Sequence, residues 1–259
     1  MDISVEDIMK SPPIHVDKDQ RLSFAVDLFE KHSIARLPVL EEGQLVGMIT
    51  QRDIMDKIGI FREDLKTSSF HISSCMSPDP IVLHPDDPLK KAITIFVREG
   101  FSGIPILDGE LVGIVTKLDI IAVYDYSQSV KDIYTGKFLS ISVDERVVHA
   151  RQLLLENNER CLPVINTDLE GIITTADVVF ELYKFRELID KHQSTLVRNI
   201  SVLEAMNQNP VTTHVSEELE QMKAVMIKEN LSTLPVVDDE NAVIGLISKD
   251  EMIDALRSR

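Results

Sequence analysis

The sequence predicts an α/β protein of the α+β type, built from four β-α-β-β-α repeats that pair two by two. The segment "LPVLEEGQLVGMITQRD" recurs as "IPILDGELVGIVTKLD", "LPVINTDLEGIITTAD" and "LPVVDDENAVIGLISKDE". Counting back 29 residues from their prolines gives the same anchor position without a gap. The prolines are Pro38, Pro105, Pro163 and Pro235, and the anchors are Met9, Met76, Tyr134 and Met206. A unit of about fifty residues therefore occurs four times.

Each repeat contains an amphipathic helix that follows a short β-like run. The runs are "PIHV", "PIVL", "FLSISV" and "PVTTHV". Thirteen residues after the anchors, apolar side chains begin to recur at i, i+3 and i+7. This spacing places them on one face of a helix. The helices are expected to begin near Leu22, Leu89, Val147 and Leu219.

Two apolar strands joined by a turn follow this helix, and Asp108-Gly109 is the best two-residue hairpin signal among the four turns. A second helix should follow the Thr-x-x-Asp tail. A three-stranded sheet of this size cannot bury both faces alone, so neighbouring repeats should pair. The predicted repeats are 1–60 and 61–126 in one module, and 127–181 and 182–259 in another.

Composition narrows the class of protein. No apolar run approaches the ~18 residues of a membrane span, and the N-terminal residues lack the pattern of a signal peptide. The net charge of −16 argues against nucleic-acid or membrane-surface binding. Cys75 and Cys161 form neither a disulfide framework nor a metal-ligand cluster. We therefore expect a cytoplasmic protein with no metal site.

The tail admits two interpretations. Ser or Thr followed by an acidic residue three positions later is a variant of the capping box. The same helix start could also bind a ligand, because amides attract an anion and a carboxylate suits a ribose diol. Cations lie in or near several tails, and spacing alone leaves both interpretations open. The tail pairs are Thr50/Asp53, Thr116/Asp119, Thr174/Asp177 and Ser248/Glu251, and the cations are Arg36, Arg52, Lys117, Arg160 and Lys249.

The four copies resemble CBS domains (cystathionine-β-synthase type) over residues 5–55, 72–121, 130–179 and 202–253. The resemblance rests on the combined pattern V-x-x-I-M, P-I-x-V, L-x-x-A, L-P-V and L-V-G-h-h-T-x-x-D, where h is aliphatic. It implies two Bateman modules whose clefts bind AMP, ADP, ATP or S-adenosylmethionine. Four repeats in one chain are similar to the nucleotide-sensing γ subunit of AMP-activated protein kinase and to archaeal stand-alone four-CBS proteins.

The resemblance also implies nucleotide-binding residues in every repeat. They are Ile14, Ala35, Pro38, Thr50, Arg52 and Asp53, with the cation Arg36, in repeat one; Ile81, Gly103, Pro105, Thr116, Lys117 and Asp119 in repeat two; Leu139, Arg160, Cys161, Thr174 and Asp177 in repeat three; and Ser248, Lys249 and Glu251 in repeat four. Repeat four departs from the pattern, because Glu251 replaces the ribose-binding Asp and Asp250 comes one residue early.

These observations favour a non-enzymatic, energy-sensing regulatory protein with no obligatory cofactor. It would bind adenine nucleotides and signal their occupancy to a protein partner such as a kinase or a metabolic enzyme. The alternatives are an interaction scaffold without a ligand and a sensor of an S-adenosylmethionine-type ligand. The seven histidines are scattered, and no Gly-rich phosphate loop is present, so an enzyme is disfavoured. Whether the modules close within one chain or in a homodimer stays open.

Overall fold

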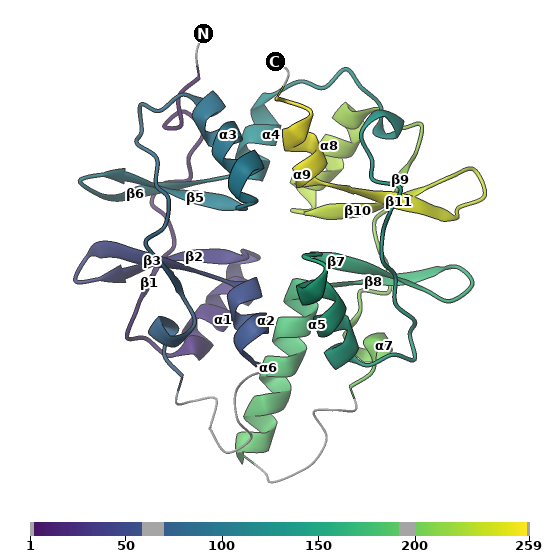
Figure 1. The fold of residues 1–259 in the computed structure, drawn as a ribbon, viewed down its shortest axis with the longest axis horizontal. Helices are drawn as coiled ribbons and strands as arrows, with labels where there is room; N and C mark the ends of the chain where they lie inside the picture. The colour runs from purple at the N-terminus through teal and green to yellow at the C-terminus, as the bar shows by residue number, and fades with distance from the viewer. Residues whose placement is uncertain (1–2, 59–69, 192–199, 258–259) are drawn as a thin grey trace. The chain divides into compact units, whose positions relative to one another are not determined.

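The computed structural model describes residues 3–58, 70–191 and 200–257, and its elements divide into two units (Figure 1). One unit comprises 14–79 and 139–210, which hold most of repeats one and three. We call it the odd unit. The other comprises 1–13, 80–138 and 211–259, which hold most of repeats two and four, and we call it the even unit.

The odd unit follows the predicted order of elements, except that the opening strand of repeat three is reduced to a single bridge, from Ile141 to Val164. Repeat one contributes β1 (Val16–Asp17), α1 (Leu22–His32), β2 (Arg36–Glu41), β3 (Gln44–Thr50) and α2 (Gln51–Ile58). The short 3-10 helix η2 (Ile72–Ser74) and strand β4 (Ser77–Pro78) follow. Repeat three contributes α5 (Val147–Glu156), β7 (Cys161–Ile165), β8 (Leu169–Thr174) and α6 (Thr175–Lys191), and the short helix α7 (Val202–Ala205) of repeat four also belongs to this unit.

The even unit has the same order, and here the opening strand of repeat two is reduced to a single bridge, from Leu83 to Ile106. Repeat two contributes α3 (Leu89–Glu99), β5 (Gly103–Asp108), β6 (Glu110–Thr116) and α4 (Lys117–Val123), followed by the 3-10 helix η3 (Val130–Asp132). Repeat four contributes β9 (Thr213–His214), α8 (Leu219–Lys228), β10 (Thr233–Val237), β11 (Val243–Ser248) and α9 (Lys249–Asp254). Among the helices of the described ranges, none is long and apolar enough to cross a membrane.

The predicted helical stripes are confirmed. Helices α1, α3, α5 and α8 begin at the residues from which the apolar spacing was counted, and the i, i+3 and i+7 side chains of each are buried. A hairpin also forms at Asp108-Gly109, but its turn is tighter than the predicted two-residue loop, because Asp108 pairs with Glu110 and only Gly109, with φ 74°, lies between them. The sequence thus specifies where these elements begin and which face they bury.

All four sheets share one arrangement. The strand that carries the proline of the repeat is antiparallel to the glycine-containing strand that follows it, as in β2/β3, β5/β6, β7/β8 and β10/β11. The β-like run that opens the repeat lies parallel to the proline-containing strand, as β1 lies along β2. In repeats two and three this parallel contact is a single bridge, from Leu83 to Ile106 and from Ile141 to Val164.

Each anchor segment joins the sheet of a different repeat. Strand β4 carries the residues after Met76 and pairs with β3 of repeat one, where Ser77 faces Met48. Lys10, after the first anchor, bridges to Ile114 of repeat two. Repeats three and four exchange anchors in the same way, through Thr135–Leu246 and Asn207–Ile172. This exchange explains why both units are discontinuous in the sequence.

Each anchor side chain packs against the glycine in the second hairpin strand of the repeat that it joins. A Cβ atom on Gly171 would lie 2.7 Å from the backbone O of Asn207 and 2.8 Å from Sδ of the anchor Met206. A Cβ on Gly245 would lie 2.5 Å from Cδ2 of the anchor Tyr134. Real Cβ atoms do not approach other atoms this closely, so a close backbone approach requires glycine here.

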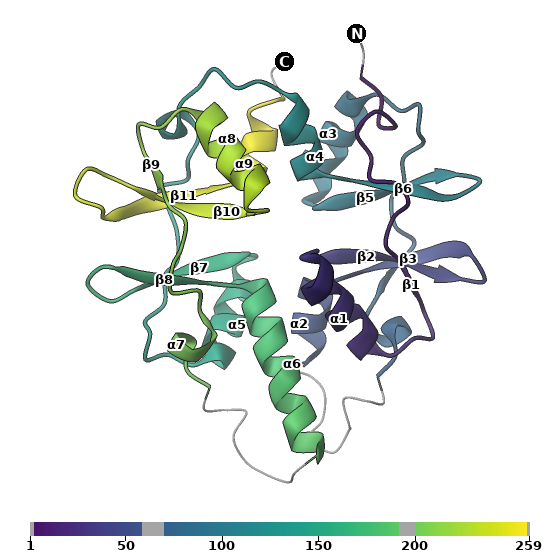
Figure 2. The same cartoon turned by 180° about the vertical axis from the view of Figure 1, so that it is seen from behind.

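The helices of each unit form one apolar core. In the odd unit α2 packs against α5 and α6, and buried residues of repeats one and three share a cluster that includes Phe29, Ile54, Leu154 and Val178. Figures 1 and 2 show these three helices side by side from both directions. In the even unit α4 packs against α3, α8 and α9. Helix packing thus joins repeats one with three and two with four, and the sheet pairing expected inside each module stays a prediction.

Candidate ligand-binding site

All four tails form capping boxes, as the first interpretation of the tail predicts. In repeat one, the backbone N and Oγ1 of Thr50 both donate to Oδ2 of Asp53, at 2.8 and 2.6 Å. The same pair of bonds measures 2.8 and 2.7 Å for Thr174 and Asp177, and 2.8 and 2.5 Å for Ser248 and Glu251. Repeat two has the same geometry. Glu251 therefore replaces Asp as a cap without loss of either bond.

Capping occupies only one oxygen of each carboxylate. The second oxygen of Asp53 accepts a hydrogen bond from Oγ of Ser77 at 3.4 Å, and the second oxygen of Glu251 accepts one from Oγ1 of Thr135 at 3.1 Å. In repeat two, Oδ1 of Asp119 lies 3.4 Å from Nζ of Lys10. In these three repeats, the second oxygen therefore faces a donor from an exchanged anchor segment.

These donors were missed by the sequence analysis. Each is the residue directly after an anchor, and that position is polar in all four repeats: Lys10, Ser77, Thr135 and Asn207. The signal was present as a polar residue at a constant offset. Its significance depends on the exchange of anchors, which the repeat pattern does not reveal.

The amides at the start of α2 and α6 are largely used within the chain. In repeat one the N–H of Gln51 donates to Ala35 O at 3.0 Å, and the N–H of Asp53 donates to Thr50 Oγ1 at 3.2 Å. Thr175 donates to Arg160 O at 3.0 Å in the equivalent position of repeat three. The Thr hydroxyl has one proton, which it gives to its own Asp. A phosphate bound here would therefore depend mainly on cationic side chains.

The odd unit brings two predicted cations together. The Arg52 guanidinium donates to three carbonyl oxygens within the C-terminal turn of α5 and beyond it: Leu154 O at 3.4 Å, Leu155 O at 3.0 Å and Glu159 O at 3.2 Å. Cations are favoured at a helix C-terminus. Burial, and next the nearby Arg160, lower the pKa of Arg52, which still stays protonated at neutral pH.

A second arginine fixes the opposite end of the same helix pair. Nε of Arg151, on α5, donates to Met55 O at 2.7 Å, and its Nη2 donates to Asp56 O at 2.8 Å near the end of α2. The start of α2 and the end of α5 are thus held by Arg52, and the end of α2 is held by Arg151. Some of the N–H groups of Arg52 are therefore used to hold the two helices together.

In the even unit, Lys117 contacts a carboxylate of the chain itself, whereas the resemblance implied that it binds a nucleotide. Its Nζ forms an ion pair with Oδ1 of Asp250, the residue that came one position early in the fourth tail. The Lys117 side chain is 4% exposed and that of Asp250 is 40% exposed. The Lys117 ammonium also lies 5.9 Å from the centre of the Phe96 ring. Helices α4 and α9 are therefore connected by a charge pair at their first turns.

The remaining predicted residues divide between the units with their repeats. The odd unit holds Ile14, Ala35, Arg36, Pro38, Leu139 and Cys161, and the even unit holds Ile81, Gly103, Pro105 and Lys249. Pro38, Pro105 and Cys161 are buried within their strands, whereas Ile14 is an exposed large apolar side chain. Ile14 is therefore the most exposed of these ten predicted nucleotide-binding residues.

Burial changes the protonation of the tail carboxylates in the odd unit. Burial raises the pKa of Asp53 and of Asp177, and the hydrogen bonds from Thr50 and Thr174 only partly oppose it. Desolvation disfavours the charged form of a carboxyl group. Ionisation of these two groups at neutral pH therefore costs folding free energy.

This cost predicts a pH-dependent effect of Asp177→Asn. The folded-state pKa of Asp177 lies above its unfolded value near 3.8, so between the two pKa values the folded chain binds more protons. The free energy of unfolding then falls as pH rises through that window. We expect the wild-type protein to gain stability relative to Asp177→Asn when pH is lowered towards 3.8, measured as the difference in urea midpoints. A difference that moved in the opposite direction would contradict this sign.

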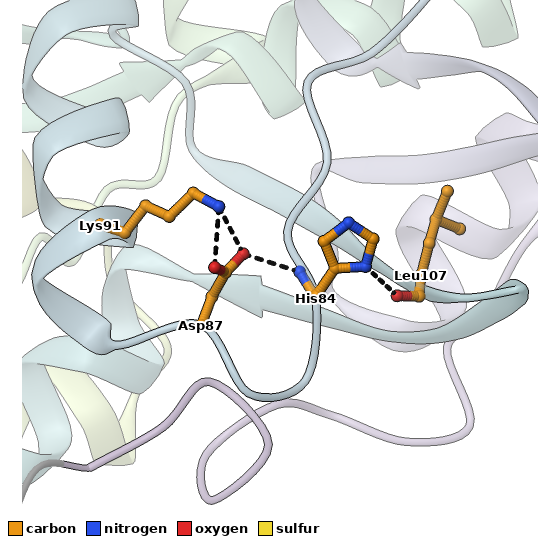
Figure 3. Close-up of polar contacts among 4 residues, drawn as sticks. All are labelled: His84, Asp87, Lys91 and Leu107. Carbon is orange, nitrogen blue, oxygen red and sulfur yellow. Dashed lines mark hydrogen bonds and ion pairs between the residues drawn. The ribbon is translucent and has the colours of Figure 1, made fainter.

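Titratable residues also meet outside the tails, and one such group lies before α3. Nζ of Lys91 contacts both carboxylate oxygens of Asp87 at 2.7 and 2.8 Å, and Asp87 accepts the N–H of His84 at 2.9 Å (Figure 3). Nδ1 of His84 lies 2.9 Å from Leu107 O and must donate to it. Although burial opposes the effect, the His84 N–H and Lys91 lower the pKa of Asp87. These contacts connect the loop before α3 to β5 and give both carboxylate oxygens of Asp87 a donor.

Comparison with known proteins identifies the class to which this fold and these tails belong. The family model for the CBS domain matches residues 5–60, 72–126, 130–184 and 197–258. The chain belongs to the CBS-domain family and contains four CBS domains. The resemblance inferred from the repeats is thereby confirmed.

Two archaeal proteins are similar to this chain over most of its length. Protein MJ1225 of Methanocaldococcus jannaschii is 25% identical over 252 residues, which cover 88% of this chain and 90% of MJ1225. Its crystal structure, described as that of a candidate archaeal homologue of g-AMPK, superposes with a TM-score of 0.88 at 22% identity, covering 98% of this chain and 99% of that one. A conserved protein from Pyrococcus horikoshii superposes with a TM-score of 0.65 at 22% identity, covering 98% and 100%. These likenesses establish the fold.

Proposed function

We propose that this chain is a non-enzymatic regulatory sensor that binds AMP, ADP or ATP in clefts between paired CBS repeats. The observation that carries the proposal is that the two oxygens of a tail carboxylate have different partners. One oxygen completes the capping box, and in repeats one and four the other accepts a hydroxyl, from Ser77 or Thr135. A ribose hydroxyl is the same kind of donor. The tail can therefore serve as a helix cap and as a ribose contact at once.

The charge of the odd unit supports a ligand that carries phosphate. The whole chain has a net charge of −16, so an anionic ligand needs a local group of cations. Arg52 reaches the backbone of Glu159, and the adjacent Arg160 is close enough to lower the pKa of Arg52. Guanidinium groups suit phosphate because their planar donors can bind two oxygens.

Signalling follows if the ligand binds two conformations with different affinity. A ligand that joined a tail to an exchanged anchor would contact segments of two repeats, and such a contact can differ between conformations. We propose that a cytoplasmic partner such as a kinase or a metabolic enzyme reads this difference as energy status. A homodimer of this chain is the other assembly that would bring the repeats together.

The decisive test is calorimetric titration of the full chain with AMP, ADP, ATP and S-adenosylmethionine. We expect at least one adenine nucleotide to bind, and Asp53→Asn or Asp177→Asn to weaken that binding about tenfold, because hydrogen bonds to a charged group contribute about 1.5 kcal/mol or more. Asparagine keeps one acceptor oxygen for the cap, so both variants should keep their melting temperature within a few degrees. The matched control is Asp239→Asn, whose side chain is 92% exposed and lies outside the tails.

Three results would contradict this proposal in different ways. No heat and no thermal shift with any of the four compounds would favour an interaction scaffold. Binding of S-adenosylmethionine alone would replace the ligand class. Loss of stability in Asp53→Asn without loss of affinity would show that this tail acts as a cap only.

A further inference from the structure

We propose that the even unit selects ligands without a phosphate group at Lys117, because the carboxylate of Asp250 already occupies the anion position there. The odd unit, with Arg52 and Arg160, would receive the phosphates of nucleotides. The even unit would receive uncharged adenine nucleosides. This inference rests on the proposed function and assigns a different ligand chemistry to each unit.

The ammonium of Lys117 is buried and already paired with a carboxylate of the chain. Its side chain is 4% exposed, and its ammonium pairs with Oδ1 of Asp250 and lies 5.9 Å from the centre of the Phe96 ring. A buried ammonium group needs an anionic partner, since desolvation of an isolated charge costs several kcal/mol. Asp250 supplies that anion from within the chain. Lys117 therefore does not require a ligand phosphate to balance its charge.

A phosphate approaching Lys117 would meet a like charge. It could bind the ammonium only by displacing Asp250, whose carboxylate would then lie beside the phosphate. Like charges at such distances repel, and the original ion pair would be lost. A nucleoside that ends in a hydroxyl group meets neither penalty. The pair thus discriminates by charge rather than by shape.

The ion pair with Lys117 explains why the fourth tail departs from the repeated pattern at Asp250. The position of Asp250 in "SKDE" corresponds to Arg52, Leu118 and Ala176 in the other three tails. Repeat four alone places an acid there, and repeat two places a lysine where it meets that acid. The departure of this tail from the repeated pattern is therefore coupled to Lys117 of another repeat.

The cations near the tails have different partners in the two units. In the odd unit the Arg52 guanidinium donates to the neutral carbonyl oxygens of Leu154, Leu155 and Glu159, with Asp53 and Asp56 nearby. In the even unit Lys10 lies 3.4 Å from Asp119, and Lys117 pairs with Asp250. Attraction for a phosphate should be stronger in the odd unit.

The test compares AMP with adenosine, which differ only in the phosphate, on the full chain. We expect Asp250→Asn to strengthen AMP binding about tenfold at the sites that bind AMP most weakly, because it removes the carboxylate that would repel the phosphate. Its adenosine affinity should stay within about twofold. Circular dichroism of Asp250→Asn establishes that the variant is folded before it is titrated.

A double variant tests the inference without leaving either charge uncompensated. In Lys117→Met/Asp250→Asn, which removes both members of the ion pair, we expect the ratio of AMP to adenosine affinity to stay within about twofold of the wild-type ratio. A tenfold fall in AMP affinity at constant adenosine affinity would identify Lys117 as a phosphate ligand and overturn the inference, while the proposed function would stand. No binding of either compound to the wild-type protein would overturn the proposed function and this inference with it.

Discussion

Replacing Gly171 by alanine is expected to destabilise the protein by about 3 kcal/mol, the upper range for inserting a methyl group into a filled site. The new Cβ would lie 2.7 Å from Asn207 O and 2.8 Å from Met206 Sδ. The methionine could turn aside, but the backbone oxygen is fixed by the ladder bonds between Ile172 and Asn207, at 3.0 and 2.9 Å. The measurement is the free energy of unfolding from urea denaturation.

Gly136→Ala is the matched control for this prediction. A Cβ on Gly136 would find its nearest atom, Cε2 of Tyr134, at 3.7 Å, which is an ordinary contact. Since Gly136 is not among the residues with positive φ, alanine there should change stability by no more than about 0.5 kcal/mol, or slightly stabilise by restricting the unfolded chain. Equal losses of stability in Gly171→Ala and Gly136→Ala would show that the close approach of Asn207 and Met206 to Gly171 does not require glycine.

Local features of the fold were predictable from the sequence, and the exchange of anchors was not. Helix starts such as Leu22 and Leu89 follow from an apolar period within one segment. The bridge between Lys10 and Ile114 joins residues of different repeats through a single pair. A contact of one or two residues has no period of its own to read. The constant spacing from anchor to proline indicated that the anchor matters, but the identity of its partner sheet depends on tertiary packing.

The same distinction applies to the candidate site. The capping boxes connect residues three positions apart, so Thr50 and Asp53 could be paired from the sequence alone. Lys117 and Asp250 are 133 positions apart, and they meet only because α4 packs against α9. Arg52 was correctly identified as a cation near a tail, yet two α5 carbonyls and the carbonyl of Glu159 already share its donors. Local patterns identify candidate groups, whereas packing decides which partners those groups find.

The Lys117–Asp250 pair should respond unequally to the loss of either partner. We expect Asp250→Asn to lower the free energy of unfolding by about 2 kcal/mol, less than the roughly 3–5 kcal/mol for a fully buried pair because Asp250 is 40% exposed. The neutral amide would leave the ammonium of Lys117 buried without its anion. Lys117→Met should cost less than about 1 kcal/mol, since methionine suits the buried site and the exposed Asp250 can be hydrated.

Urea denaturation of the two single variants and the double variant measures this asymmetry, with Lys91→Met as the control for a more exposed pair. The Lys91 side chain is 49% exposed, so its loss should cost less than about 0.5 kcal/mol. The double variant should be close in stability to Lys117→Met, because the Asp250→Asn change leaves no buried charge unpaired once the lysine is gone. If Asp250→Asn were no more destabilising than Lys117→Met, the carboxylate of Asp250 would not be compensating for the burial of the Lys117 ammonium. The charge-based selection of ligands by the even unit would then lose its physical basis.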